Sequence, residues 1–344
     1  MNFNNLFVGR KAMGINMYTA NEKRYENTSF NYLPNGLALP KISVGLWQNF
    51  GCDADYDEIK DIILTAFDMG VTHFDLANNY GPKPGDAERN FGKIFAENLK
   101  PYRDELIIST KAGYEMWSGP YGGRGGTRKY LIASLNQSLC RMGLDYVDIF
   151  YHHCMTPETP LDETALALSD IVRQGKSLYA GISNYDGKTM HRMHHRCEDY
   201  NVPFIINQNR YSIIDRTIEK NGLKSQSAKK EKGIIAFSPL AQGRLSDKFK
   251  DGIPKNSRLY GREDYCKNLG LDDRQIAQIK QLYEFAHERG ETTSQLAIQW
   301  LLAKGVTSVL IGVRTKAQLL ENLAALDKPP LTETELKHID LIFK

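Results

Sequence analysis

The sequence predicts a closed barrel of eight parallel strands surrounded by helices, a (β/α)₈ barrel. From about Lys41 onward, short apolar runs rich in β-branched residues alternate with longer helical patterns. This alternation is typical of a parallel sheet covered by helices. It occurs eight times, and eight strands close such a barrel. The chain of 344 residues is also longer than the roughly 250 residues that one barrel requires.

The predicted strands are short and mostly apolar on both faces, as expected for strands that are buried on both sides. They are Lys41–Trp47, Thr72–Ala77, Leu106–Lys111, Val147–His153, Ser177–Asn184, Phe204–Tyr211, Gly233–Leu240 and Ser308–Val313. Helical patterns between them include Asp57–Met69, Arg128–Met142, Pro160–Arg173 and Gly187–Tyr200. An open doubly wound sheet is the alternative, but the segment Gly45–Gly51 lacks the G-x-G-x-x-G pattern that such a sheet normally carries after its first strand.

Three segments depart from an ideal barrel. The turn signal Pro34-Asn35-Gly36 lies within Tyr32–Leu39 and predicts a hairpin before the first barrel strand. A long, glycine-rich, mobile loop is predicted at Tyr114–Thr127, after the third strand. A second long loop is predicted at Ala241–Leu271, after the seventh strand. Loops of this length in a compact domain are usually functional or disordered.

Nothing in the composition divides the chain into several domains. We expect a single domain over residues 29–344, preceded by an N-terminal extension over residues 1–28 that is flexible at least in its first part. The chain is 41% hydrophobic and 25% charged, which is ordinary for a soluble globular enzyme. The net charge of +3 is too small and dispersed to indicate a nucleic-acid partner, and Lys229, Lys230 and Lys232 are interpreted as a solvated helix end.

The cysteine pattern and the hydropathy indicate a protein of a reducing compartment. The five cysteines show no C-x-x-C spacing, which favours free thiols over a disulfide framework. No run approaches 18 apolar residues, so no membrane partner is expected, and the first 16 residues contain no signal-peptide core. We therefore expect a cytoplasmic protein.

Four ionisable residues lie at or just beyond the carboxyl ends of three neighbouring predicted strands. Asp75, Lys111 and His153 lie at strand ends, and Tyr80 lies in the loop after Asp75. Each has an ordinary alternative: a surface tyrosine, a helix-capping aspartate or a core histidine. Lys111 is harder to explain in this way, because an ammonium that ends an apolar strand requires a partner or a ligand. Catalytic side chains of a barrel lie at the carboxyl ends of its strands.

These four residues fit the reduction of a carbonyl group. When a hydride reaches the carbonyl carbon, the oxygen must be protonated, and Tyr80 can supply the proton. A tyrosine with a pKa near 10 is a weak acid, so we expect the Lys111 ammonium to favour the phenolate and lower that pKa. Asp75 would hold Lys111 charged, and a neutral His153 would orient the carbonyl oxygen. Alternation along the strand directs His152 to the opposite face.

The order and spacing of these residues resemble the aldo-keto reductase superfamily over about Tyr32 to Asn322. Within it, the chain is most similar to the bacterial L-glyceraldehyde 3-phosphate reductases, which are related to potassium-channel β subunits. The catalytic pattern is found at Phe74–Gly81, Ser109–Lys111 and Tyr151–His153. Subgroup similarity is carried by Gly45–Trp47, His73–Pro82, Tyr102–Tyr114 and Arg141–Tyr151. Cys154 and Arg314 depart from the pattern, since Arg and Ser are usual there.

The resemblance implies a nicotinamide cofactor, NADPH, and a set of residues that bind it. The nicotinamide end would be held by Ser183, Asn184, Gln208 and Phe237, and Trp47 would also contact the cofactor. The pyrophosphate would lie against Ser238, Pro239, Leu240, Gln242 and Gly243. The adenosine end would meet Lys248, Arg258, Gly312, Arg314, Gln318, Glu321 and Asn322. Three cations near one ribose favour a 2′-phosphate, although loop cations are also common on ordinary solvated surfaces.

The expected substrate is a small aldehyde in a pocket with aromatic walls. The pocket residues would be Trp47, Tyr80, Tyr114, Trp117 and His153. A phosphorylated aldehyde would also need a cation near the mouth, for which Arg124 and Arg128 are available. No metal is expected. His191 and His195 have a zinc-compatible spacing near His194 and Cys197, but they fall on a helix outside the barrel.

Two functions remain open from the sequence. The first is an NADPH-dependent reductase of small aldehydes such as L-glyceraldehyde 3-phosphate or methylglyoxal. The second is an NADPH-binding redox-sensing module with little turnover, like the potassium-channel β subunits. His153 favours the enzyme, because the channel subunits tend to carry Asn there. The resemblance also implies a homo-oligomer, a tetramer or an octamer.

Overall fold

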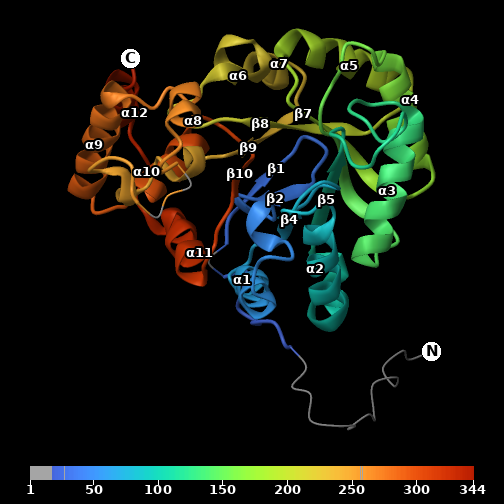
Figure 1. The fold of residues 1–344 in the computed structure, drawn as a ribbon, viewed down its shortest axis with the longest axis horizontal. Coiled ribbons are helices and arrows are strands. Elements are labelled where there is room, and N and C mark those ends of the chain that lie inside the picture. Colours follow the sequence, from blue (N-terminus) through green and yellow to red (C-terminus); the bar gives the residue numbers. More distant parts are fainter. Residues whose placement is uncertain (1–17, 27, 256, 258) are drawn as a thin grey trace.

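Eight parallel strands close into a barrel, as the sequence predicts (Figure 1). The computed structural model describes residues 18–26, 28–255, 257 and 259–344. Each strand pairs with the next, and β10 pairs with β3 to close the sheet. The barrel strands are β3 (Ile42–Gly45), β4 (His73–Asp75), β5 (Ile107–Ala112), β6 (Val147–His152), β7 (Ser177–Ser183), β8 (Phe204–Arg210), β9 (Gly233–Phe237) and β10 (Ser308–Ile311).

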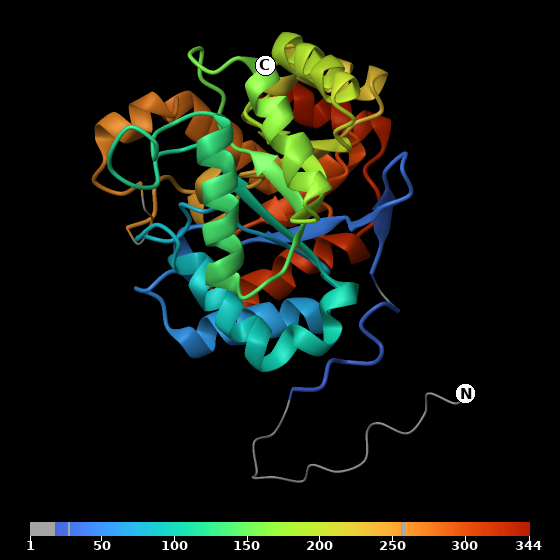
Figure 2. The same cartoon turned by 90° about the vertical axis from the view of Figure 1, so that its right-hand side faces the viewer.

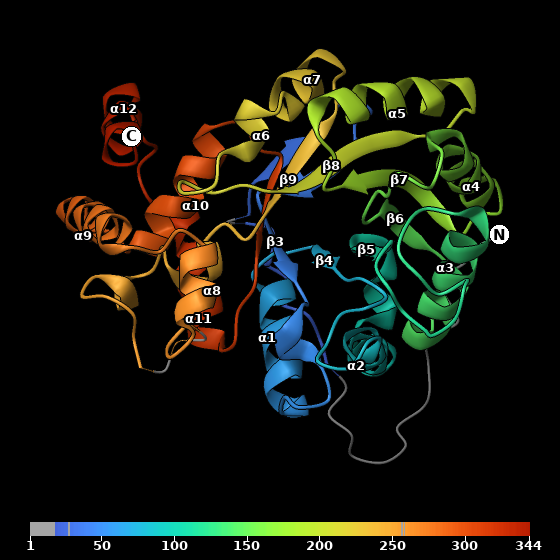
Figure 3. The same cartoon turned by 45° about the horizontal axis from the view of Figure 1, so that its top comes forward.

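Helices surround the barrel (Figure 3). The four helical patterns of the sequence correspond to α1, α3, α4 and α5, with ends that differ by at most one residue. Side-chain caps start several of them. Thr127, for example, accepts a hydrogen bond from the Tyr130 amide at the start of α3. The helices are α1 (Tyr56–Asp68), α2 (Asp86–Ile94), α3 (Arg128–Met142), α4 (Leu161–Arg173), α5 (Gly187–Asp199), α6 (Thr217–Lys220), α7 (Leu223–Lys229), α8 (Glu263–Asn268), α9 (Asp273–Glu288), α10 (Thr293–Ala303), α11 (Lys316–Leu323) and α12 (Glu333–Ile342).

Short helical turns complete the secondary structure. A π-helical turn, η2 (Phe95–Leu99), extends α2. The 3₁₀ turns are η1 (Gln48–Phe50), η3 (Lys100–Glu105), η4 (Ala241–Gly243), η5 (Asp247–Phe249) and η6 (Ala324–Asp327). None of the helices in the described part of the chain combines the length and the apolar character that crossing a membrane requires.

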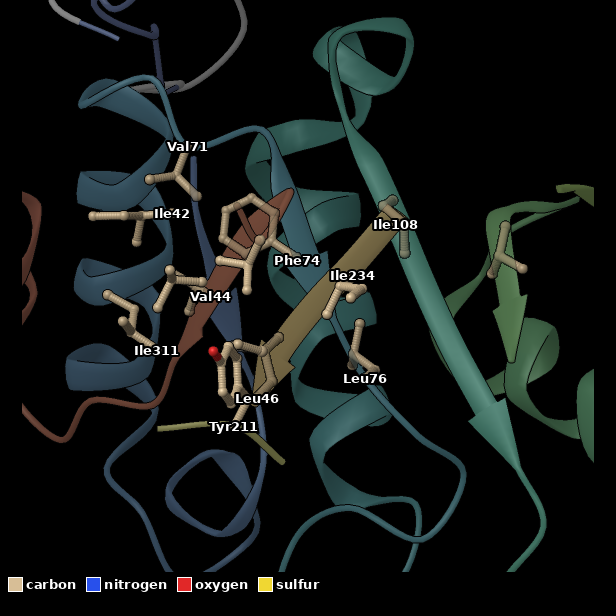
Figure 4. Packing of buried hydrophobic residues seen from close by; sticks show 14 of the residues in the cluster. Ile42, Val44, Leu46, Val71, Phe74, Leu76, Ile108, Tyr211, Ile234 and Ile311 are labelled. Carbon is tan, nitrogen blue, oxygen red and sulfur yellow. The ribbon is translucent and has the colours of Figure 1, made fainter. Parts of the chain in front are cut away.

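The main core fills the space between the barrel and its helices. Ile42, Val44 and Phe74 point outward from β3 and β4 and pack in one cluster with Ile108 and Ile311 (Figure 4). The other face of each strand points into the barrel, so the strands are buried on both sides. This explains their mostly apolar character in the sequence.

The predicted hairpin precedes the barrel and closes the end at which the barrel strands begin. Strand β1 (Phe30–Tyr32) pairs antiparallel with β2 (Ala38–Pro40). Gly36 takes a φ of +86° in the turn, a value that suits glycine because it has no Cβ. Leu33 and Leu39 of the hairpin pack with the inward-facing barrel side chains Ile149, Tyr151, Ile205, Ile235 and Leu310.

The long loop predicted after the seventh strand is more ordered than expected. The prediction of an irregular segment over Ala241–Leu271 is wrong for Glu263–Asn268, which form α8. The physical reason is a small hydrophobic cluster that packs this segment against α9 and contains Phe249, Leu259, Cys266, Leu271 and Ile279. The first long loop does connect β5 to α3 without a helix or strand.

Part of the N-terminal extension contacts the barrel. The first 16 residues, for which we predicted flexibility, lie outside the described residues. Beyond them, the Tyr18 hydroxyl donates to Asp68 of α1 at 2.7 Å, and the Ala20 amide donates to the Tyr102 hydroxyl at 3.0 Å. Figure 2 shows this dark blue segment leading up to the hairpin. The segment therefore packs against the outside of the barrel between α1 and η3.

Gly70 offers a test of that packing. Its φ is +82°, and a Cβ there would lie 1.7 Å from Thr28 Oγ1 and 2.3 Å from the Arg24 carbonyl oxygen. Gly143 has a φ of +64° with open space around its Cβ position. We expect Gly143→Ala to lower the free energy of unfolding by about 1–2 kcal/mol, and Gly70→Ala to lower it by roughly 2 kcal/mol more. Urea unfolding of both variants measures the difference, and equal losses would contradict the contact.

Candidate active site

The carboxyl ends of β4, β5 and β6 bring the four predicted catalytic residues together. Asp75 is the last residue of β4, Lys111 lies near the end of β5, and His153 directly follows β6. The Lys111 Nζ lies 4.8 Å from the ring centroid of Tyr80, and the rings of Tyr80 and His153 are 6.0 Å apart. Adjacent parallel strands end at the same edge of a sheet, so residues distant in sequence share one site.

Asp75 and Lys111 form a fully buried ion pair. Neither side chain is exposed to solvent, and Lys111 Nζ lies 2.5 Å from Asp75 Oδ2. Lys111 also donates to the Leu76 carbonyl at 2.6 Å. The other carboxylate oxygen of Asp75 accepts from Ser109 at 2.6 Å and from Gln208 at 3.0 Å. Buried charges are tolerated when they are paired and hydrogen-bonded in this way.

A chain of hydrogen bonds inside the barrel orients Asp75. Because Ser109 donates its proton to Asp75, it must accept from His73 Nε2, which lies 2.9 Å away. Burial lowers the pKa of His73 to about 4, so its ring is neutral and Nδ1 accepts from Ser43 at 2.8 Å. Ser43 in turn accepts from Ser308 at 2.6 Å. In this series of hydrogen bonds from β10 to β5, the donor and the acceptor of each bond are therefore assigned.

The sequence analysis missed this chain of polar residues. A signal for Ser109 was available, because it lies two residues before Lys111 and alternation places both on the inner face of β5. His73 bears the same relation to Asp75. Ser43 and Ser308 gave no comparable signal, since a lone serine within an apolar run has many explanations.

The expectation that Lys111 lowers the pKa of Tyr80 is wrong for this structure. Burial, followed by the Asp75 charge, raises the pKa of Tyr80 well above its usual value. The ion pair carries no net charge, so Asp75 offsets the field of Lys111, whose own pKa burial lowers. The Tyr80 hydroxyl is therefore protonated at neutral pH and available as a donor.

His153 is neutral and faces the site. Burial, followed by the charge of Lys111, lowers its pKa well below the usual value. The Tyr114 ring stands edge-on to it, with centroids 4.6 Å apart. His152 takes the opposite face, where its Nδ1 lies 2.7 Å from the Tyr185 hydroxyl. The strand alternation therefore placed the two histidines correctly.

The predicted aromatic wall is only partly at the mouth of the site. Trp47 is 48% exposed and its ring lies 6.5 Å from that of Tyr80. Tyr114 lies on the other side of the site, where its ring contacts the His153 ring. Trp117 is one layer further out, because its ring packs on Tyr130 at 5.2 Å and the Tyr130 hydroxyl bonds to the Tyr114 carbonyl.

The residues Ser183, Asn184, Gln208 and Phe237, predicted for the nicotinamide end, lie on β8 and β9 and at or just after the end of β7, whereas Trp47 follows β3. The Asn184 side chain donates to the His153 carbonyl at 3.0 Å and to Ser183 Oγ at 3.1 Å. Gln208 is buried and donates to Asp75, so it is closer to the ion pair than the sequence indicated. Phe237 ends β9 with its ring 6.0 Å from the Arg210 guanidinium.

The backbone after β9 is strained where a pyrophosphate was predicted. Ser238, Ala241 and Gln242 take positive φ values of 54°, 46° and 62°, and Gly243 follows at 91°. Pro239 is buried and Leu240 partly buried between them. Non-glycine residues in this conformation cost free energy and tend to cluster at ligand sites. Gln48 and Asn184 add positive φ values of 31° and 61° after two other barrel strands.

The residues predicted for the adenosine end lie on both sides of the first turns of α10. On one side is the exposed Lys248 in η5, whose neighbour Asp247 accepts from the Thr293 amide at 2.8 Å. On the other side, Gln295 donates to the Glu321 carbonyl at 2.9 Å. The remaining predicted residues here are the exposed Gly312 and Arg314, Gln318, which accepts from the Arg314 amide, and the buried Asn322. Arg258 lies outside the described residues.

The histidine-rich helix α5 lies outside the barrel, as predicted. The ligand atoms of His194, His195 and Glu198 lie within 4.8 Å of one another. Both histidines contact the Glu198 carboxylate, at 3.2 Å and 2.9 Å. Cys197 is buried and does not belong to this group. All five cysteines are free, which confirms the expectation of thiols.

The chain is similar to known proteins over most of its length. The sequence model of the Aldo/keto reductase family matches residues 41–344. The chain is 46% identical to the L-glyceraldehyde 3-phosphate reductase of Escherichia coli K12, over 94% of this chain and 95% of that protein. It is 32% identical to a putative voltage-gated potassium channel subunit beta of Schizosaccharomyces pombe, over 92% and 94%. A probable subunit beta of Arabidopsis thaliana is 33% identical, over 86% and 90%.

Proposed function

This chain belongs to the aldo/keto reductase family and is an oxidoreductase, and we propose that it reduces small aldehydes to alcohols with NADPH and with Tyr80 as the general acid. The observation that carries the proposal is the grouping of Tyr80 and His153 over the buried Asp75–Lys111 pair. A protonated phenol and a neutral imidazole are the donors that a carbonyl oxygen needs when it becomes an alkoxide.

Each residue has a separate part in the proposed reaction. The reduced nicotinamide supplies a hydride to the carbonyl carbon when it is bound. His153 orients the carbonyl oxygen, and Tyr80 transfers its hydroxyl proton to that oxygen, which gives the alcohol. The tyrosinate then regains a proton from solvent. Asp75 and Lys111 hold the base of the site rigid, because each is fixed by further hydrogen bonds.

The surface after β9 and β10 supports NADPH as the cofactor. The strained backbone of residues 238–243 suits close approach to a pyrophosphate. Lys248 and Arg314 are exposed cations beyond it. A 2′-phosphate needs such cations, and an unphosphorylated ribose does not.

Replacing these cations should reduce the preference for NADPH. We expect the double variant Lys248→Ala/Arg314→Ala to raise the KM for NADPH by about 10-fold to 100-fold while the KM for NADH changes little. NADPH would lose the charge-assisted hydrogen bonds to its 2′-phosphate, and NADH has no such phosphate to lose them from. Steady-state kinetics with both cofactors measure this. Lys250→Ala is the control, since Lys250 is already paired with Asp251. Parallel changes for both cofactors would contradict the assignment.

The proposed substrates are compact aldehydes such as L-glyceraldehyde 3-phosphate or methylglyoxal. The aromatic side chains around Tyr80 and His153 and the name of the E. coli relative support this choice. A panel of aldehydes with NADPH and with NADH, followed by the loss of reduced-nicotinamide absorbance, tests it. Turnover of about 1–10³ s⁻¹ on at least one small aldehyde is expected.

The relatives named as channel β subunits support a second function. In that case the chain would bind NADPH as a redox signal and turn over slowly. Tight cofactor binding together with turnover below about 10⁻² s⁻¹ on every aldehyde of the panel would favour this function, because ordinary enzymes are far faster.

We also propose a compartment, a domain organisation and an oligomeric state for the protein. Five free thiols support a reducing compartment such as the cytoplasm. We propose that residues 29–344 form one catalytic domain and that the chain assembles as a homo-oligomer, a tetramer or an octamer. Size-exclusion chromatography with light scattering measures the assembly.

A further inference from the structure

Arg124 lies beside the site, in the loop between β5 and α3. Its Nε donates to Cys154 Sγ at 3.1 Å, and its guanidinium carbon lies 5.1 Å from the Tyr114 ring centroid. Tyr114 in turn contacts the His153 ring. One aromatic side chain therefore separates the guanidinium from the proposed carbonyl-binding histidine.

Close packing of the loop fixes this position. The Gly125 amide donates to the Gly113 carbonyl at 2.9 Å, which ties the residue after Arg124 to the end of β5. A Cβ at Gly125 would lie 2.9 Å from the hydroxyls of Thr156 and Thr159, and one at Gly126 would lie 2.3 Å from Thr164 Oγ1. The two glycines let the loop approach the segment after β6, and this approach brings Arg124 to Cys154.

Arg124 has no acidic partner among the residues that the structure describes. Within the described part of the chain, no carboxylate oxygen lies within 4.0 Å of its nitrogens, and the side chain is exposed. The neighbouring cations are engaged elsewhere. Arg128 pairs with Asp170, and the Lys129 ammonium lies 4.9 Å from the Tyr121 ring. Of the two arginines that the sequence offered, the structure places Arg124 at the site and directs Arg128 away.

We propose that Arg124 binds the anionic end of the substrate, a phosphate ester one or two carbons from the aldehyde group. The proposal rests on the aldehyde reduction proposed above and specifies its substrate class. With Nε bonded to Cys154 and the guanidinium also hydrogen-bonded to the Tyr114 side chain, the remaining Nη–H groups are donors that can meet two phosphate oxygens. The carbonyl at Tyr80 and His153 and the phosphate at Arg124 would then lie at opposite ends of a short substrate.

The kinetic test compares glyceraldehyde 3-phosphate with neutral glyceraldehyde. We expect Arg124→Ala to lower the ratio of their kcat/KM values by about 10-fold to 100-fold, mainly through the KM of the phosphorylated substrate, because a charge-assisted bidentate contact is lost. The ratio for Arg124→Lys should lie between those of the wild type and Arg124→Ala, since lysine keeps the charge but lacks the planar pair of donors. Arg128→Ala is the matched control. A ratio that stays within twofold in Arg124→Ala would overturn the proposal.

A binding measurement separates this proposal from the proposed function. Calorimetric titration with glycerol 3-phosphate, which cannot be reduced, should show weaker binding to Arg124→Ala than to the wild type and to Arg128→Ala. If the wild type reduces no aldehyde, the proposed function fails, and the titration still decides whether Arg124 binds an anion. Equal affinities in all three proteins would refute the anion site even if both aldehydes are reduced.

Discussion

Tyr80→Phe is expected to bind NADPH as the wild type does and to lose about 10²-fold to 10⁴-fold in kcat, the range that a positioned general acid contributes. The variant removes one oxygen atom and leaves the ring, which contacts Trp47, His153 and Lys111. Cofactor fluorescence titration measures binding, and the consumption of NADPH with an aldehyde measures turnover. Near wild-type turnover would show that another group protonates the alkoxide.

A control variant and a pH profile test whether the loss of turnover is specific to the Tyr80 hydroxyl. Tyr121→Phe on the neighbouring loop is the matched control, because the Tyr121 side chain is 59% exposed and should be replaceable without loss of turnover. The pH profile is the second test. Since burial raises the pKa of Tyr80, the hydroxyl keeps its proton and the rate should not fall between about pH 7 and 9. A phenol with a lowered pKa would lose its proton, and activity, as the pH rises through that pKa.

Lys111→Met is expected to reduce both stability and activity. The substitution leaves the Asp75 carboxylate buried without a cation, and removing one partner of a buried ion pair costs about 3–5 kcal/mol. The cost should be at the upper end, because neither side chain is exposed. Denaturant unfolding measures the stability, and turnover should fall by at least about 10²-fold because Tyr80 loses its fixed surroundings.

The double variant Lys111→Met/Asp75→Asn separates the two effects. It contains no unpaired buried charge, and the amide oxygen introduced in place of the carboxylate can still accept from Ser109, so most of the lost stability should return. Turnover should stay low, since the ion pair is absent. A single variant as stable as the wild type would contradict a fully buried ion pair, and restored turnover in the double variant would contradict its part in catalysis.

The fold could be predicted from the sequence because each strand carries its own signal. Apolar runs such as Val147–His153 are recognisable without knowledge of their neighbours, and eight of them specify a closed barrel. Strand alternation also distinguished His153 from His152. The helix α8 was missed because it is held by a small cluster with α9, and tertiary contacts of this kind leave little periodicity in a segment of six residues.

The finer properties of the site could not be predicted, because they depend on several strands at once. The pKa of Tyr80 is raised by burial and then by the Asp75 charge, whereas the sequence analysis considered only the effect of the nearby lysine. The hydrogen-bond chain through Ser43, His73 and Ser109 requires the register of three strands. Arg124 reaches Cys154 only through the path of its loop. The sequence identified which residues lie at the strand ends and left their interactions open.

A single-turnover experiment tests the central claim most directly. The protein is saturated with NADPH, mixed rapidly with excess glyceraldehyde 3-phosphate, and followed by the loss of reduced-nicotinamide absorbance. We predict that the bound cofactor is oxidised at about 1 s⁻¹ or faster in the wild type, and that this oxidation is about 10²-fold to 10⁴-fold slower in Tyr80→Phe. Bound NADPH that stays reduced for minutes in the wild type, with this aldehyde and with methylglyoxal, would contradict the account.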